Sequence, residues 1–484
     1  MKKTFSFSAF ALAIATLTPL ATQAEVKLPS IFSDHMVIQR DQAVPVWGWA
    51  DPGESVSVTF GEHKATTKAN PSGRWQVDLP AMPANTTGTD LTIRGQNTHK
   101  FEDVLVGEVW LCSGQSNMEW TVNRSGNAKE EIAKANDPRI RHIKIKHHPA
   151  KEPQTDVPSP GWQVASPETV GSFSAVGYYF ARHLIENLDV PVGLIGSNWG
   201  GTRIEPWTAP SGFAAVPALS DIHDKIDRFP SMKKKKKAKD SDEMIEVVNH
   251  QSPLALYNGM IHPLVPYAIC GAIWYQGESN NGEGMLYHEK MKALIHGWRK
   301  VWNKPEMPFY YVQLAPYQYG GNRNEKLPGI WQAQLKTLDI PHTGMAVITD
   351  IGNPKNIHPK NKQDVGKRLA LWALAKTYSQ DDLIYSGPLF RQHHITDGKI
   401  RVEFDMTGQG LKSRDGKPLT HFEIAGADGT FHPATANIKG DHLILHSEAV
   451  KNPKHVRFAW DQVANPNLVN SADLPASPFT TSDF

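Results

Sequence analysis

The hydrophobic pattern changes twice along the chain and divides it into three regions. Residues 25–105 contain short strand-like runs such as VPVWGWADPG, SVSVTFGEH, RWQVDLPA and DLTIRGQ, separated by Gly, Pro, Asn and Asp. This spacing predicts a small N-terminal β-sandwich. After Tyr378 similar runs return, among them KIRVEFDM, HFEIAGADG and HLILHSE. Residues 381–484 are therefore predicted to form a second β-rich region.

Between these regions the apolar runs are nearly continuous. They read VGEVWLCSG, PVGLIGSNWGG, YAICGAIWYQGE, PFYYVQLAP and GMAVITDIG, which is typical of strands buried on both faces of a sheet. Helix-length stretches such as AVGYYFARHLIENL and LYHEKMKALIHGWRKVW separate them. Residues 106–380 are predicted to form an α/β domain with a largely parallel sheet. We expect a three-layer α/β/α, flavodoxin-like core, flanked by the two β-rich portions.

The first 24 residues have the pattern of a secretory signal peptide. Lys2 and Lys3 precede an apolar stretch, and small residues end at Ala24. The apolar stretch is short for a bilayer span, and Thr and Pro interrupt it. We expect a mature protein that begins near Glu25, is periplasmic or secreted, and does not insert into a membrane.

Composition and charge exclude some functions. Hydrophobic residues make up 40% and charged residues 21%, which is the balance of a globular protein. The net charge is +2, but six lysines crowd into residues 233–239. Without a broad basic surface, nucleic acid is not the expected partner. Residues 233–243 are predicted to be a solvated surface insertion, with a patch for acidic polysaccharide as the alternative.

The chain has only two cysteines, Cys112 and Cys270, and each lies in an apolar run. They are predicted to be small buried hydrophobic residues. A single disulfide between them is the alternative, because the sequence does not fix their separation.

A serine follows the first buried strand of the central region. Ligands of doubly wound sheets collect outside the carboxyl ends of the strands, and VGEVWLC is followed there by Ser113-Gly-Gln-Ser116-Asn. A serine at such a turn can expose its hydroxyl as a nucleophile beside backbone N–H groups that bind an oxyanion. An ordinary helix N-cap is the alternative. The Gly-x-Ser-x-Gly motif of the α/β-hydrolases is absent.

Three other strand ends carry polar or glycine residues. Gly200 and Gly201 follow PVGLIGSNW, and paired glycines bring free N–H groups close to a ligand. Gln276 follows YAICGAIWY, where its amide can donate to an oxyanion or satisfy its own loop. His358 lies after GMAVIT and before a helix-like stretch. It is the best candidate for a base that acts on Ser116.

Taken together, these blocks resemble the SGNH hydrolases and, within them, the sialate O-acetylesterase family. The matching segments are Gly-Gln-Ser116-Asn, Asn-Trp-Gly-Gly-Thr, Trp-Tyr-Gln-Gly-Glu-Ser-Asn and Ile-His358-Pro-Lys-Asn-Lys, together with the N-terminal LPSIFSDHMVIQRDQAVPVWGWADPGE. The resemblance implies that Ser116 attacks an acetyl carbonyl and that His358 takes the serine proton and later activates water. It implies that the Ser116 N–H, the Gly200 or Gly201 N–H and the Gln276 amide hold the oxyanion. Neither a metal nor a cofactor is implied.

The pattern departs from the usual catalytic triad at its third member. Many SGNH enzymes have an aspartate three residues before the histidine, where this chain has Lys355, and relatives often have aspartate where it has Asn356. We expect Asn356 or a Ser–His dyad, with Asp350 as the other candidate. An uncharged partner stabilises imidazolium less than a buried carboxylate does.

The expected function is removal of acetyl groups from sugars, with 9-O-acetyl sialic acid as the first substrate. The alternatives are the same chemistry on acetylated xylan or xyloglucan, and a non-catalytic carbohydrate-binding protein. The serine and histidine argue against the binding protein, which needs neither a nucleophile nor a base. Trp199 is predicted to stack on a sugar. Arg203 is predicted to contact the substrate carboxylate or to pair with Glu278.

Overall fold

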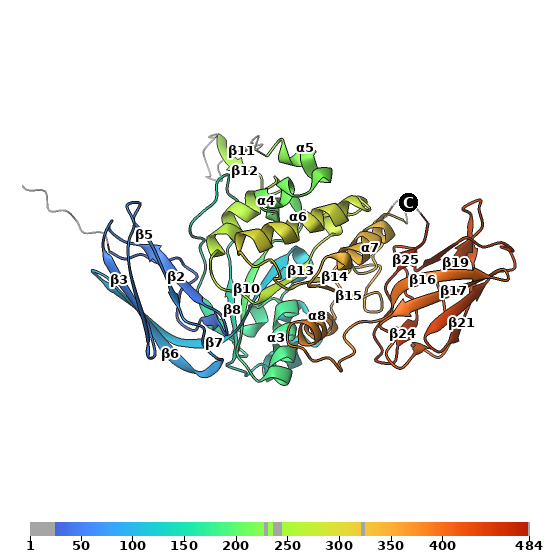
Figure 1. Cartoon of the computed structure of the whole chain (residues 1–484), viewed down its shortest axis with the longest axis horizontal. Helices are drawn as coiled ribbons and strands as arrows, with labels where there is room; N and C mark the ends of the chain where they lie inside the picture. Colours follow the sequence, from blue (N-terminus) through green and yellow to red (C-terminus); the bar gives the residue numbers. More distant parts are fainter. Residues whose placement is uncertain (1–24, 227–230, 236–243, 321–324, 483–484) are drawn as a thin grey trace, which may run out of the picture.

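The computed structural model describes residues 25–226, 231–235, 244–320 and 325–482. The predicted leader and residues 236–243 of the lysine-rich segment lie outside the described residues. A β-rich portion, a central portion of mixed helices and strands, and a second β-rich portion follow one another along the long axis of the molecule (Figure 1). No helix in the described part of the chain is long and apolar enough to cross a membrane.

The predicted apolar runs form the central sheet. Its strand order is β15-β14-β13-β7-β10-β8-β9. Neighbours are parallel throughout except for the last pair, β8 and β9. The strands are β7 (Thr98–Gly114), β8 (Ile140–Lys144), β9 (Trp162–Val164), β10 (Val192–Asn198), β13 (Gly271–Tyr275), β14 (Phe309–Val312) and β15 (Thr343–Ala346). Every residue of β10, β13, β14 and β15 is buried, as a strand covered on both faces requires.

Helices pack on both faces of this sheet (Figure 1). The pair α3 and α8 lies on one face, and α4, α6 and α7 lie on the other. The bounds of the helices are α1 (Ser116–Glu119), α2 (Ala128–Lys134), α3 (Ala175–Leu188), α4 (Pro210–Ala214), α5 (Ser220–His223), α6 (Leu286–Val301), α7 (Lys326–Lys336) and α8 (Lys362–Lys376). Ser174 caps α3 and Asn361 caps α8 through side-chain oxygens that accept backbone N–H bonds. The prediction of a mixed α/β core with a largely parallel sheet is confirmed.

A single long strand joins the N-terminal sheet to the central sheet. The first part of β7 pairs antiparallel with β6, and its second part pairs parallel with β10 and β13. The boundary predicted at residue 105 therefore falls within one strand. The other strands of this portion are β1 (Val37–Gln39), β2 (Val44–Trp49), β3 (Ser55–Phe60), β4 (His63–Lys68), β5 (Arg74–Leu79) and β6 (Asn85–Arg94).

The C-terminal portion contains two four-stranded antiparallel sheets, β16-β17-β22-β21 and β20-β19-β23-β25, and the pair β18-β24. Its apolar side chains form a hydrophobic cluster separate from that of the central sheet. The strands are β16 (Leu389–Thr396), β17 (Lys399–Asp405), β18 (Leu411–Ser413), β19 (Phe422–Ala425), β20 (Phe431–Pro433), β21 (Thr435–Lys439), β22 (His442–His446), β23 (His455–Phe458), β24 (Leu468–Asn470) and β25 (Phe479–Thr480).

The lysine-rich segment begins in a two-stranded hairpin. Lys233, Lys234 and Lys235 belong to β11 (Ser231–Lys235), which pairs antiparallel with β12 (Met244–Val248). Both cysteines are free and buried. Burial raises the pKa of each thiol, so the prediction of small hydrophobic residues is confirmed and the disulfide is not formed.

Candidate active site

Ser116 lies at the carboxyl end of β7, where the chain turns into α1. Gly114 ends the strand with a φ of +131°, and a Cβ at this residue would lie 2.2 Å from the Tyr275 carbonyl oxygen. Only glycine fits such a close approach. The Gln115 N–H then donates to the same carbonyl oxygen at 3.0 Å. The turn presents Ser116 at the edge of the sheet, and within the described residues its N–H has no acceptor.

His358 lies in the loop between β15 and α8, and the fold brings it to Ser116. Its Nε2 is 2.8 Å from the Ser116 Oγ, although 242 residues separate the two in sequence. Burial lowers the pKa of His358 below the usual 6.5, and the positive charges of Lys362 and Arg124 lower it further. The ring is therefore neutral near pH 7, which is the state that accepts a serine proton.

The structure does not bring a carboxylate to the ring of His358. Asp350 accepts two hydrogen bonds from the Arg368 guanidinium, at 2.6 and 2.7 Å. The Asn356 side-chain oxygen accepts the backbone N–H of His358 at 3.0 Å. Within the described part of the chain, the Nδ1 of His358 has no hydrogen-bond partner. The Asp350 alternative is therefore wrong for this structure, and the arrangement is that of a Ser–His pair.

An indole ring contacts His358 instead. Trp120 stacks on the imidazole with ring centroids 4.7 Å apart and planes 21° from parallel. The Arg124 guanidinium packs over the same indole, with Cζ 3.8 Å from the ring centroid. The sequence interpretation missed both residues. Their position just after the serine block was the one available signal.

A buried polar network ties the serine turn to the histidine loop. The Asn117 Nδ2 donates to the Ile357 carbonyl oxygen at 3.0 Å and to the Glu278 Oε1 at 2.6 Å. The Lys362 Nζ donates to the Asn117 Oδ1 at 2.5 Å. Burial lowers the pKa of Lys362 to about 7 and raises that of Glu278. The neighbours of Ser116 and His358 are thus fixed to each other.

Gly200 lies beside Ser116, but its N–H already has an acceptor. A Cβ at Gly200 would be 3.2 Å from the Ser116 Cβ, and its N–H donates to the Glu119 Oε2 at 2.8 Å. Burial alone would raise the pKa of Glu119, but His147, Lys144 and this N–H lower it to about 2. Glu119 is therefore ionised and holds the predicted donor. By contrast, the Gly201 N–H has no acceptor within the described residues.

Gln276 does not have the predicted role of an oxyanion donor. Its amide nitrogen donates to the Thr202 carbonyl oxygen at 3.1 Å and to the Asn280 Oδ1 at 2.8 Å. Its side-chain oxygen accepts the Tyr287 hydroxyl at 2.8 Å. The side chain is completely buried and both amide N–H bonds are used. It satisfies its own loop, which was the alternative interpretation.

Arg203 also already has partners within the protein. Its guanidinium forms ion pairs with Glu205 and Glu283, so the predicted pair with Glu278 is wrong. Glu278 lies in the Asn117 network instead. Glu205 and Glu283 also pair with Lys290, so these two carboxylates neutralise two cations, and Arg203 is not free to bind the carboxylate of a substrate.

Trp199 is half-buried, and two imidazole rings stack on it. His147 lies 4.2 Å and His250 lies 4.6 Å from the indole, measured between ring centroids. Trp207 and Trp274 are core residues. Within the described residues no group of three or more His, Cys, Asp or Glu side chains could hold a metal ion.

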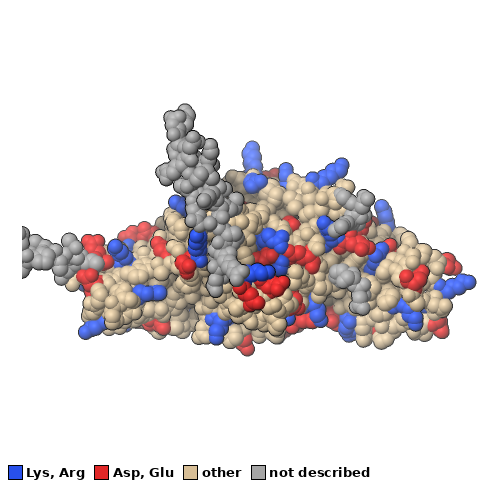
Figure 2. Space-filling view, turned by 90° about the horizontal axis from the view of Figure 1, so that it is seen from above, with Lys and Arg blue, Asp and Glu red and all other residues tan. Residues whose placement is uncertain are grey.

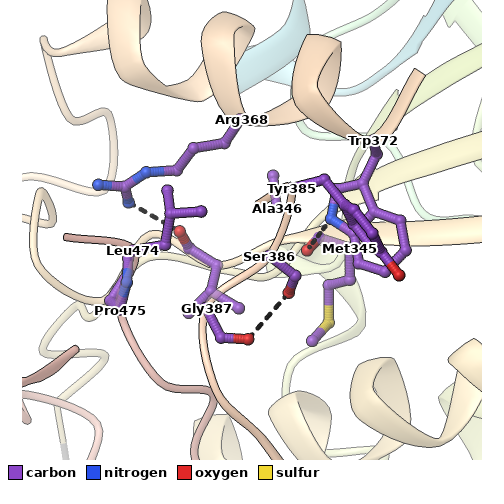
Figure 3. A pocket seen from close by; sticks show the side chains of 10 residues that line it. Met345, Ala346, Arg368, Trp372, Tyr385, Ser386, Gly387, Leu474 and Pro475 are labelled. Carbon is purple, nitrogen blue, oxygen red and sulfur yellow. Dashed lines mark hydrogen bonds between the residues drawn. The ribbon is translucent and has the colours of Figure 1, made fainter. Parts of the chain in front are cut away.

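A small pocket lies away from Ser116, between α8, β15 and the C-terminal chain (Figure 3). The Trp372 Nε1 donates to the Met345 carbonyl oxygen at 2.9 Å there, and the Arg368 guanidinium donates to the Val347 carbonyl oxygen at 2.8 Å. Residues of the central portion and of the C-terminal chain line it, and neither Ser116 nor His358 does.

The fold and the site place the protein among the esterases. A family model described as carbohydrate esterase, sialic acid-specific acetylesterase, matches residues 106–375, which is more than half of the chain. The chain belongs to this family.

Full-length relatives agree with this assignment. The sialate O-acetylesterase of Homo sapiens is 32% identical over 94% of this chain and 92% of its own. That of Mus musculus is 28% identical over 94% of each chain. The crystal structure of a carbohydrate acetylesterase from Xanthomonas citri, XAC1771, superposes with a TM-score of 0.85 and 39% identity, over 95% of this chain and all of that one.

Proposed function

We propose that this carbohydrate esterase uses Ser116 as its nucleophile and His358 as its general base. The observation that carries the proposal is the 2.8 Å distance between the Ser116 Oγ and the His358 Nε2. Ser116 attacks the acetyl carbonyl carbon while its proton passes to His358. The sugar oxygen leaves with that proton, and an acetyl-enzyme remains. Water then gives a proton to His358 and attacks the acetyl group, which releases acetate and restores Ser116.

The oxyanion of each tetrahedral intermediate needs N–H donors that are not already used. We assign this role to the N–H groups of Ser116 and Gly201. Gly200 can take part only if the Glu119 carboxylate releases its N–H. Loss of one such donor typically lowers turnover by about 10²–10³-fold.

As the substrate we propose 9-O-acetyl sialic acid. The support is the printed names of the curated relatives and the description of the family. Acetylated polysaccharides such as xylan and xyloglucan are the second candidate, because the Xanthomonas citri relative is named only as a carbohydrate acetylesterase.

We further propose that residues 1–24 direct export to the periplasm or the cell exterior, and that 25–105, 106–380 and 381–484 are the domains. For the core we propose the three-layer, flavodoxin-like class. If β8 is set aside, the parallel strands follow the order 2-1-3-4-5 of that class. The helices on both faces of the sheet also support this assignment.

The test is acetate release by the purified protein and by Ser116→Ala, with 9-O-acetyl sialic acid, acetylated xylan and acetylated xyloglucan side by side. We expect release from the sialic acid and its loss in the variant. Release that survives the substitution would overturn the serine mechanism. Release from the polysaccharides alone would keep the mechanism and overturn the substrate.

A further inference from the structure

The cations near Ser116 differ in whether they are already neutralised. Arg203 pairs with two glutamates. Lys144 contacts the Glu119 carboxylate at 3.2 Å and the Asn198 side-chain oxygen at 2.7 Å. Lys362 is completely buried. Arg124 is exposed, and within the described part of the chain no carboxylate lies within ion-pair distance of it.

Contacts with the protein fix the position of Arg124, although no carboxylate of the described residues neutralises its charge. It ends the short turn η1 (Val122–Arg124) and packs over Trp120. Just beyond it, the Gly126 N–H donates to the Lys360 carbonyl oxygen at 2.7 Å, and the Gln363 amide donates to the Gly126 carbonyl oxygen at 2.7 Å. This loop is therefore clamped to the histidine loop.

The chemistry of a guanidinium suits this position to binding an anion. Stacking uses the flat face of the group, while its five N–H donors lie in the plane and can bind a carboxylate in a bidentate manner. Arg124 and His358 contact the same indole ring. A substrate group bound to Arg124 would thus lie beside the indole that His358 also contacts.

We propose that Arg124 binds the anionic group of the substrate and makes the site selective for O-acetylated acidic sugars that carry a carboxylate. This inference rests on the proposed function, and it names the residue that recognises the charge of the substrate. The exposed lysines of the histidine loop, Lys355 and Lys360, are weaker candidates, because within the described residues Arg124 is the exposed cation that packs on the indole beside His358.

A bound carboxylate would also assist the reaction. Within the described residues the ring of His358 has no carboxylate partner, and the positive charge of Arg124 acts on it. This charge opposes the imidazolium that forms when Ser116 loses its proton. A substrate carboxylate on Arg124 would offset it. An acidic substrate should therefore have a higher kcat as well as a lower KM than a neutral one.

The experiment compares 9-O-acetyl-N-acetylneuraminic acid with its C1 methyl ester, which keeps the acetyl group and removes the charge. Acetate release is measured for the wild type, Arg124→Gln, Arg124→Lys and Arg94→Gln. Arg94 is an exposed arginine of β6 in the N-terminal sheet and serves as the matched control. The assays are run at about pH 8, where the neutral form of an unperturbed histidine predominates.

We expect the wild type and Arg94→Gln to prefer the acid over its methyl ester by about 10-fold or more in kcat/KM, the usual effect of one charge-assisted hydrogen bond. Arg124→Gln should abolish this preference, and Arg124→Lys should keep part of it. A preference that survives Arg124→Gln, or an equal loss on both substrates, would overturn the inference. Acetate release from xylan but from neither sialic acid derivative would overturn the proposed substrate instead.

Discussion

Contacts of two kinds orient His358, and neither is the carboxylate of a conventional triad. Trp120 stacks on the face of the ring. Asn117 holds the carbonyl group of Ile357, the residue before it. An aromatic contact of this type contributes about 0.5–1.5 kcal/mol beyond burial. It restricts the tilt of the ring but does not stabilise the imidazolium as a carboxylate would.

Trp120→Leu should therefore lower kcat by more than its loss of stability alone would explain. A base displaced by about 1 Å can reduce the rate by about 10²-fold, whereas Trp120→Phe keeps an aromatic face and should retain most of the activity. The measurement is kcat with 4-nitrophenyl acetate together with a thermal melt. As a control, Trp75→Leu removes a buried indole of the N-terminal sheet and should lower Tm without changing kcat. Equal kcat values for Trp120→Leu and Trp120→Phe would exclude a positioning role for the indole.

The pH profile should reflect the charges around His358. Burial and the positive charges of Lys362 and Arg124 lower its pKa, so kcat/KM on a neutral ester should fall only below pH 6.5. Arg124→Gln removes one of these charges and should raise the pKa of His358. The acid limb of the profile should then move to higher pH, while Arg94→Gln leaves it in place. A shift to lower pH in Arg124→Gln would contradict this account.

At the scale of elements, the first turn of α8 carries a lysine that is completely buried. Its pKa is lowered from 10.5 to about 7, so between these values the unfolded chain binds more protons than the folded one. This group therefore makes the protein more stable as pH rises from about 7 toward 10.5, by at most about 1.4 kcal/mol per pH unit. Lys362→Met should flatten that slope, which denaturant unfolding at several pH values would measure. An unchanged slope would show that Lys362 stays charged in the folded protein.

The turn between β7 and α1 should tolerate no side chain at Gly114. Gly114→Ala combines a positive φ with a contact of 2.2 Å to a backbone oxygen. We expect a loss of about 3 kcal/mol or more in the free energy of unfolding, and displacement of Ser116. Gly53→Ala is the matched control, since its φ is +83° but a Cβ there meets nothing within 4 Å. It should cost about 1 kcal/mol, and both values come from denaturant melts. Equal losses in the two variants would show that the strand contact is unimportant.

At the scale of the whole molecule, the C-terminal portion supports the central sheet near the site. The Gln313 amide donates to the buried Ser477 Oγ at 2.9 Å, and the Tyr317 N–H donates to the Gln462 carbonyl oxygen at 2.8 Å. A chain that ends at residue 380 exposes these groups together with part of α7. We expect it to melt at a lower temperature than the full chain and to lose acetate release. Unchanged melting and activity would show that the central domain stands alone.

The surface charge agrees with a small charged substrate better than with a polyanion. On the face shown in Figure 2, the acidic and basic side chains of the described residues are interspersed and form no continuous basic field. Selectivity for an anion would then depend on a few placed groups such as Arg124, and less on a long-range field.

The sequence by itself determined the types of the elements and the residues at the strand ends. Continuous apolar runs predicted the buried strands, and two of their ends carry Ser116 and His358, which the structure places 2.8 Å apart. This prediction succeeded because parallel strands bring their carboxyl ends to one edge of the sheet. Residues that follow different strands in the sequence therefore lie close together there. The burial of Cys112 and Cys270 followed from the same local patterns.

Only the tertiary structure decided which hydrogen bonds these residues make. The Glu119 carboxylate accepts the Gly200 N–H, and the Gln276 amide donates to a loop carbonyl oxygen. Arg203 pairs with glutamates of the protein instead of a substrate. The stack of Trp120 and Arg124 beside His358 was likewise absent from the pattern. A hydrogen bond requires two groups within about 3 Å, and segments far apart in sequence meet at that precision only after the core has packed. Sequence patterns fix which edge of the sheet a side chain reaches, and packing selects its partner there.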